Sequence, residues 1–322
     1  FFFKQKTAYE IVSRDWSSNV CSSDLSGLYV AAGAGVNFAS NQSWSAMAGD
    51  RSEGIQREAT AHYAQPGFAA HNGLNAALMA AHGLDSVQQV FNGEDGFARV
   101  FLREQFDPAR ATRDLGRAFE TERLSFKPYP SCRFTHPVAS AVLELHARLG
   151  TRAAEAEAID IEMGPQAWHV VGRPEPTRIH PSAKVTAQFS AYWVAAVAWA
   201  YGEVSARHVF SEVPPSAPVR AWLPRITCKP YEDVSTREIG GATVTVRGPF
   251  ETKSMAVTVA KGHPDNPFSN AEVIGKFTSN VKLAGWRDDD ARRFAEYILA
   301  LDGANSLNFL YERMAAPITK TV

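Results

Sequence analysis

The stretch KPYPSCRFTHPVASAVLEL, residues 127–145, is the most informative part of the sequence. Its early prolines predict an irregular loop, and Pro137 suits the first turn of a helix that follows. Within ten residues the loop carries four side chains suited to acid–base or anion chemistry: Lys127, Cys132, Arg133 and His136. The positive end of a helix dipole favours an anion. The stretch therefore predicts a carboxylate site where the loop enters the helix.

Two side chains of this loop have distinct expected tasks. Arg133 can bind a carboxylate through two parallel hydrogen bonds. A histidine at a helix N-terminus tends to stay neutral, so His136 suits a base or a hydrogen-bond donor. The alternative interpretation is a proline-rich connector with surface charges, in which Cys132 is buried as a small apolar residue.

The pattern over residues 121–265 predicts an inserted α+β domain built outward from this loop. A helix is expected from Pro137 to Gly150, since glycine suits a helix end. Strands are expected where apolar and polar residues alternate, and the last two lie close enough to pair as a hairpin. The further elements are a more buried helix at 183–202 and strands at 158–163, 242–248 and 253–262.

Helices are predicted on the N-terminal side of this α+β domain, in a partial helical domain at residues 26–120. PGFAAHNGLNAALMAAHGL, residues 66–84, has a proline at its start and Gly83 as its cap. Asp85 suits the N-cap of a second helix that ends at Gly93. A third helix is expected over 108–120.

The chain is expected to return to helices over residues 266–322. Ser269 and Glu272 form the pattern of a capping box. DDDARRFAEYILAL, residues 288–301, is amphipathic, with Phe294 and Ile298 on its apolar side. The predicted fold class is therefore mainly α with an α+β part: a helical domain, an inserted α+β domain and a helical return.

The first 25 residues, FFFKQKTAYEIVSRDWSSNVCSSDL, differ from the rest. They show neither the apolar run of a signal peptide nor the periodicity of an amphipathic helix. KQKTAYE, RDWSS and VCSSDL are what a common short-read sequencing adapter encodes in one reading frame. We therefore expect residues 1–25 to be translated adapter, and the protein sequence to begin near Ser26 with an upstream part missing.

Composition excludes several function classes. The formal net charge of −1 argues against a nucleic-acid or membrane-surface partner. Outside residues 1–25 the only cysteines are Cys132 and Cys228, too few for a disulfide framework, so a reducing cytoplasm is expected. Zinc-type spacings, GxGxxG and P-loop patterns are absent from the sequence, so no metal or cofactor is expected.

Three segments resemble the MmgE/PrpD family, which includes 2-methylcitrate dehydratases and cis-aconitate decarboxylases. KPYPSCRFTHPVASAVLEL resembles the family's KPYPxCRxTH segment. AQPGFAAHNGLNAALMAAHGL, residues 64–84, is similar to its HPGxAAHxGxxAALLAxxG helix, and HPDNPFSNAEVIGKF, residues 263–277, to its GxPENPLSxEEVxxKF segment. The resemblance implies a metal-free lyase for a small polycarboxylate, usually a homodimer, with its site between a helical domain and a lid.

The resemblance also implies roles for the loop residues. Such an enzyme removes a proton next to a carboxylate, so cations must hold the growing negative charge, and an acid must protonate the product. Lys127 falls on the family's active-site lysine and is expected to clamp or protonate the substrate. His136 falls on the family's loop histidine and is expected to contact the substrate. Cys132 stands where some members carry a histidine, and we place it with Arg133 among the substrate-binding residues.

The sequence departs from the family pattern at two places. His62 stands where the family often has a lysine and Gln65 where it has a histidine; His62 is either a replacement proton donor or a surface residue. The tyrosine of the family's FSxPY segment falls on Trp193. Because an indole cannot donate an acidic proton, either the neighbouring Tyr192 substitutes or the chemistry has shifted.

Three functions are compatible with these residues. The first is a lyase that dehydrates or decarboxylates a small polycarboxylate. The second is an isomerase or epimerase of the same fold, which fits the loss of the tyrosine at Trp193. The third is a non-catalytic relative that binds a carboxylate or a partner subunit. The intact KPYPSCRFTH segment favours retained anion chemistry.

We predict that the chain as written is inactive and poorly soluble. The family's Asp- and His-rich upstream segment has no counterpart in residues 26–322, so part of the active site and its helical partners would be missing. The measurement is a thermal melt of the purified chain together with turnover of 2-methylcitrate, citrate and cis-aconitate. A cooperative melt with clear turnover would contradict the prediction.

Overall fold

The computed structural model describes residues 61–85, 88–91, 93–94, 96–102, 107, 109, 112–232, 241–303 and 306–315. The chain divides into two compact units, Phe1–Glu122 and Arg123–Val322. The expected adapter sequence at 1–25 and the start of the predicted helical domain lie outside the described residues. The predicted domain boundary at 265 stays a prediction.

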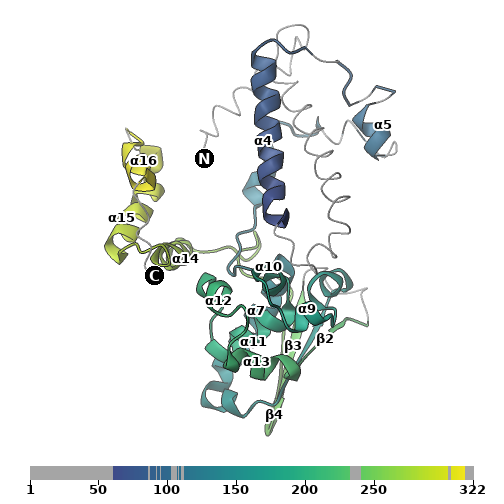
Figure 1. Cartoon of the computed structure of the whole chain (residues 1–322), viewed down its shortest axis with the longest axis vertical. Coiled ribbons are helices and arrows are strands. Elements are labelled where there is room, and N and C mark those ends of the chain that lie inside the picture. Colours follow the sequence, from purple (N-terminus) through teal and green to yellow (C-terminus); the bar gives the residue numbers. More distant parts are fainter. Residues whose placement is uncertain are drawn as a thin grey trace. The chain divides into compact units, whose positions relative to one another are not determined.

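The first unit contains the long helix α4, Ala61–Ala81, and the short helix α5, Phe97–Leu102 (Figure 1). The helix predicted over residues 66–84 is confirmed, although it begins earlier than expected. Gly83 ends it with φ = 92°, and the amide of Leu84 donates to the carbonyl of Met79 at 3.0 Å. Glycine suits this position because it adopts positive φ without steric cost.

The helix predicted over residues 85–93 is wrong for the residues described there. Residues 88–91 and 93 form bends and turns, and the amide of Phe97 donates back to the carbonyl of Val90 at 2.8 Å. At Gly96 a Cβ atom would lie 2.8 Å from the carbonyl of Phe91, so this reversal depends on glycine.

The helix predicted over residues 108–120 is also largely wrong. Residues 109 and 112 are helical, but 113–117 form turns. Asp114 and Gly116 have φ values of 56° and 77°, which a right-handed helix cannot accommodate.

The second unit is built on a four-stranded sheet in the order β2-β1-β3-β4. Strand β1, Ala158–Met163, pairs in parallel with β2, Ile226–Pro230, and antiparallel with β3, Ala242–Gly248. Strand β4, Phe250–Val257, forms the predicted hairpin with β3 and starts earlier than the sequence indicated. The predicted strand at 158–163 is confirmed at both ends, whereas β2 was not predicted.

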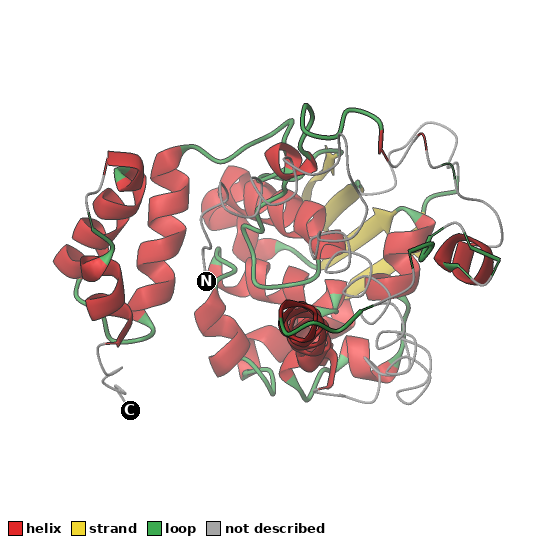
Figure 2. Cartoon of the chain, turned by 90° about the horizontal axis from the view of Figure 1, so that it is seen from above, coloured by secondary structure: helices red, strands yellow, loops and turns green. Residues whose placement is uncertain are grey.

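One face of the sheet carries the hydrophobic core, against helices α7, His136–Leu149, and α11, Ala191–Tyr201 (Figures 1 and 2). Along β1 the buried side chains are Ile159, Ile161 and Met163. The alternate side chains of β1 face polar partners, as in the ion pair between Asp160 and Arg247 at 2.8 Å. The predicted fold class, mainly α with an α+β part, is confirmed.

The single helix predicted over residues 183–202 is two helices, α10, Lys184–Gln188, and α11. Ser190 separates them because its hydroxyl accepts a hydrogen bond from the amide of Trp193 at 2.9 Å, which caps α11. The shorter helices of the unit complete the crossover between β1 and β2: α8 (Pro165–Ala167), α9 (Pro176–Ile179), α12 (Ala206–Ser211) and α13 (Ala217–Trp222).

Three helices follow the sheet: α14, Asn270–Lys282, α15, Asp288–Leu299, and α16, Asn308–Ala315. The capping box predicted at the start of α14 is confirmed, since Ser269 and Glu272 exchange backbone and side-chain hydrogen bonds. Aromatic rings hold the three helices together, among them Phe277, Trp286, Phe294 and Phe309. None of the helices that the structure describes combines the length and apolar character that crossing a membrane requires.

The segment between β4 and α14 lies against the start of the KPYPSCR loop. The amide of Phe126 donates to the carbonyl of Gly262 at 2.8 Å. Gly262 has φ = 81°, and a Cβ atom there would lie 2.1 Å from the carbonyl oxygen of Phe126. Only glycine therefore permits this approach of the two backbones.

We predict that Gly262→Ala lowers the free energy of unfolding by about 2–3 kcal/mol, because it combines backbone strain with a clash against another backbone. Gly275→Ala is the matched control, since a Cβ atom at Gly275, inside α14, has no neighbour within 4 Å. That change should raise the free energy by about 0.5–1 kcal/mol. Chemical denaturation of the protein expressed from the intact gene measures both; equal effects would contradict the close approach.

Candidate functional site

Helix α10 anchors the middle of the loop that carries the predicted site residues. The side-chain amide of Gln188 donates to the carbonyl of Pro130 at 2.9 Å, and the amide of Cys132 donates to the carbonyl of Gln188 at 2.8 Å. Within the loop, the hydroxyls of Ser131 and Thr135 share a buried hydrogen bond of 2.7 Å. Proline has no amide proton to donate, so these bonds from Gln188, Cys132 and the two hydroxyls fix the middle of the proline-rich loop.

The loop enters α7 without a break. A 3-10 turn, Arg133–Thr135, precedes the helix, and the amides of Thr135 and His136 donate to the carbonyls of Cys132 and Arg133. These two amides are therefore already bonded, and the predicted carboxylate site where the loop enters the helix stays a prediction.

Arg133 lies across the start of the loop and connects it to the segment before α14. Its Nη1 atom donates to the carbonyls of Phe126 and Lys261 at 3.3 and 3.2 Å. Nη2 has one long contact, 3.5 Å to the hydroxyl of Ser125, and Nε has no hydrogen-bond partner among the described residues. The edge formed by Nε and Nη2 is therefore the part of Arg133 that can take a carboxylate.

His136 is fully buried, and its contacts fix its protonation. Nδ1 lies 3.4 Å from Nη1 of Arg133, and Nε2 lies 3.3 Å from the carbonyl of Ser131. The guanidinium can only donate and the carbonyl can only accept, so the proton sits on Nε2 and the ring is neutral. The pKa of His136 is lowered to about 3, chiefly by burial; the Ser131 bond opposes this shift, and the charges of Arg133, Lys127 and Lys276 add to it.

Lys127 is exposed, and its ammonium has no hydrogen-bond or ion-pair partner among the described residues. Its backbone carbonyl accepts a hydrogen bond from Nζ of Lys276, on α14. Burial and, second, the charge of Lys127 lower the pKa of Lys276. Within the described part of the chain, Lys127, Arg133 and Lys276 form no ion pair with a carboxylate, so this corner of the unit carries uncompensated positive charge.

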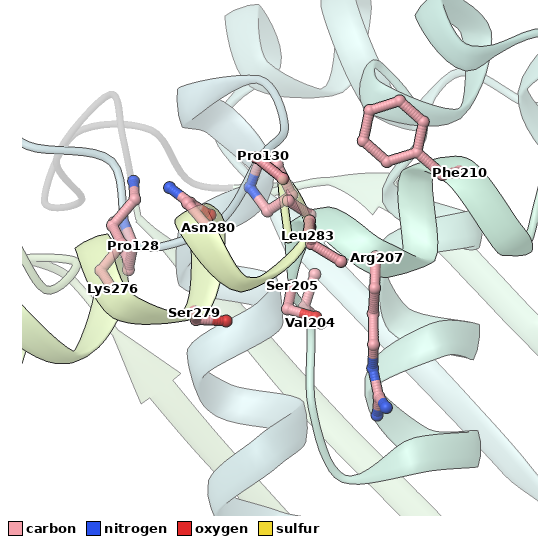
Figure 3. Close-up of a pocket in the computed structure, with 12 residues that line it drawn as sticks. Pro128, Pro130, Val204, Ser205, Arg207, Phe210, Lys276, Ser279, Asn280 and Leu283 are labelled. Atoms are coloured by element: carbon pink, nitrogen blue, oxygen red, sulfur yellow. The ribbon is translucent and has the colours of Figure 1, made fainter. Parts of the chain in front are cut away.

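A pocket of ≈ 690 Å³ lies beside the loop (Figure 3). Pro128 and Pro130 of the loop line it, together with Lys276 of α14 and residues 204–207 at the start of α12. Figure 3 shows Lys276 beside Pro128, whereas the side chain of Arg207 extends away from it. Lys276 thus belongs both to the pocket wall and to the cationic corner.

The position of Cys132 agrees with the alternative interpretation of the loop, in which this cysteine packs as a small apolar residue. Its side chain is half-buried and packs against the core, and burial raises the pKa of the thiol. A protonated, apolar thiol is a weak ligand for a carboxylate. Its predicted role in substrate binding stays a prediction without a supporting contact.

Tyr192 does not lie with the loop residues. Its side chain is buried in the first turn of α11, where the hydroxyl donates to the carbonyl of Gly172 at 3.2 Å, and burial raises its pKa. The neighbouring Trp193 is fully buried and donates to the carbonyl of Glu212 at 3.0 Å. Both side chains act as core residues, and the catalytic role of Tyr192 stays a prediction.

His62 belongs to α4 in the first unit, and its side chain lies outside what the structure describes. Its predicted role as a proton donor stays a prediction. Lys276 was not among the predicted site residues, although it stands in the segment 263–277 on which the family resemblance partly rests. Among the described residues, His, Cys, Asp and Glu side chains do not gather in groups of three that could hold a metal ion.

The described residues therefore form a mainly helical protein with an α+β part, in which helices cover a mixed four-stranded sheet. Residues 129–302 match the MmgE/PrpD C-terminal domain, and residues 27–109 match the MmgE/PrpD N-terminal domain. The chain therefore belongs to the MmgE/PrpD family, whose members are generally lyases or related enzymes. No curated protein matches the chain.

We predict that His136 makes the protein less stable in acid. Because its folded pKa is depressed to about 3, the unfolded chain binds a proton that the folded protein rejects between pH 6.5 and pH 3. The free energy of unfolding should therefore fall by a few kcal/mol on acidification through this window. The His136→Asn variant has no imidazole to protonate, so it should lose less stability over the same pH range. Denaturant melts of both proteins at pH 7 and pH 4 measure the difference; parallel losses would contradict a neutral, buried imidazole.

Proposed function

We propose that the protein is a lyase that removes a proton next to a carboxylate of a small polycarboxylate, by dehydration or decarboxylation. The observation that carries the proposal is the positive charge of Lys127, Arg133 and Lys276, which is not balanced by a carboxylate of the described residues. Cations kept together in this way are costly unless an anion joins them. A substrate with several carboxylates supplies that anion.

Lys127 and Arg133 have different roles in binding the substrate. The Nε and Nη2 atoms of Arg133 bind one carboxylate side by side, and the ammonium of Lys127 approaches the same or a neighbouring carboxylate from solvent. When a base takes the proton from the adjacent carbon, negative charge moves onto the carboxylate. Fixed cations stabilise that charge more than they stabilise the ground state, which lowers the barrier.

The end of the reaction needs a proton donor. In a dehydration the carbon–oxygen bond breaks and the hydroxyl leaves as water after it receives a proton; in a decarboxylation carbon dioxide leaves and the carbanion takes the proton. The ammonium of Lys127 is the donor we propose. His62 is retained as the alternative proton donor that the sequence suggests. We further propose a cytoplasmic homodimer, as the family resemblance implies.

A second candidate function is an isomerase or epimerase, in which the proton is removed and returned and no group departs. The observation that favours it is Trp193, which stands in place of the family's tyrosine and is bonded within the core. Such a reaction needs the same carboxylate clamp but no acid for a leaving group. A non-catalytic carboxylate-binding relative needs the clamp alone.

We predict that Lys127→Ala lowers turnover of 2-methylcitrate, citrate or cis-aconitate about a hundredfold in the protein expressed from the intact gene, because it removes an electrostatic and acid–base group. Lys253→Ala is the control, since Lys253 is a surface lysine on β4 that pairs with Glu251. Steady-state kinetics and a thermal melt of each variant are measured. Normal turnover of Lys127→Ala would end its assignment, and exchange of solvent deuterium into substrate without net product would favour the isomerase.

A further inference from the structure

Lys276 is the one cation of the site that does not lie on the loop. It projects from the middle of α14, is half-buried, and donates from Nζ to the backbone carbonyl of Lys127, 149 positions away in the sequence. Among the described residues this carbonyl is its hydrogen-bond partner, and no carboxylate pairs with it. Helix α14 does hold a nearby carboxylate, Glu272, but that group pairs with Lys261 at 3.0 Å and caps the helix.

The position of Lys276 is not what packing alone favours. A lysine on a half-exposed helix face normally extends its ammonium into water. Here burial and the neighbouring charge of Lys127 both lower the pKa of Lys276. The contact therefore forms although desolvation and charge repulsion both disfavour the ammonium. Ionisable groups held in such unfavourable surroundings are common at functional sites.

We propose that Lys276 is a positioning residue for the carboxylate clamp: by holding the carbonyl of Lys127, it fixes the start of the loop and thereby the places at which Lys127 and Arg133 meet the substrate. This inference rests on the proposed function. The Phe126–Gly262 hydrogen bond and the bonds of Arg133 fix the residues on either side of Lys127. Lys276 fixes Lys127 itself, through its backbone carbonyl.

The same lysine links the clamp to the pocket. Its side chain lines the cavity of ≈ 690 Å³ next to Pro128, and the carbonyl it holds immediately precedes that proline. Of the three cations, only Lys276 lines this cavity, so a substrate held by Lys127 and Arg133 meets the cavity through Lys276. Loss of the Lys276 contact should therefore weaken substrate binding more than it slows the chemical step.

The test compares three variants in the protein expressed from the intact gene. Lys276→Met keeps the length and helix propensity of the side chain but removes the donor and the charge. Lys276→Arg keeps both. Lys282→Met is the matched control, because Lys282 lies on the same helix and pairs with Asp288 at the surface. Thermal melts show whether each variant folds. If Lys276→Met does not fold, Lys276→Gln replaces it, because the glutamine side chain is too short to reach the carbonyl.

Two measurements decide the proposal: hydrogen–deuterium exchange of the peptide covering residues 126–136, and the dissociation constant of citrate by calorimetry. Lys276→Met should exchange about tenfold faster there and bind citrate about tenfold more weakly, as loss of one charge-assisted hydrogen bond allows. Lys276→Arg should recover most of both values. Lys282→Met should match the wild type in both.

The outcomes separate the positioning role from the function itself. Unchanged exchange in Lys276→Met overturns the proposal. Faster exchange with unchanged citrate affinity also overturns it, because Lys276 would then stabilise the loop without serving the clamp. If the wild type binds citrate and Lys127→Ala binds it equally well, the carboxylate clamp of the proposed function fails, whatever the exchange shows for Lys276.

Discussion

The contact between the start of the loop and the segment before α14 is the constraint on which the site depends. Phe126 bonds to Gly262, and Arg133 bonds to the carbonyls of Phe126 and Lys261, so two segments far apart in the sequence share one set of hydrogen bonds. Gly262 makes the approach possible because it has no side chain. Contacts of such long sequence separation form only once the unit has folded, so the cations converge as a consequence of folding.

A neutral histidine at the centre allows these cations to stay together. The buried ring of His136 gives one nitrogen to Arg133 and the other to Ser131, so it orients the guanidinium without adding charge. A protonated ring would place a third positive charge beside Arg133 and Lys127 in a region of low dielectric constant. The imidazole supports Arg133 in this structure, and its expected contact with the substrate stays a prediction.

Local signals in the sequence located some elements and failed at others, such as the helices expected at 85–93 and 108–120. Alternation located β1, and Ser269 with Glu272 located the start of α14, because both depend on near neighbours in the chain. Strand β2 escaped prediction because its pairing with β1 crosses a long helical connection, and the apolar run that ends at Tyr201 concealed the cap at Ser190. For the site, the family resemblance located the loop, but it could not show that both nitrogens of the histidine are occupied inside the protein, or that a lysine from α14 reaches the loop.

The core helix α11 has a consequence for how this protein can change over time. Ala191, Ala195, Ala196 and Ala198 are all fully buried, and the helix is enclosed by α7, α9, α13 and β2. Any larger residue at these positions adds volume that close-packed neighbours cannot release, at a cost of about 1–3 kcal/mol. Substitutions at these alanines are therefore expected to be tolerated less well than substitutions in the exposed loops.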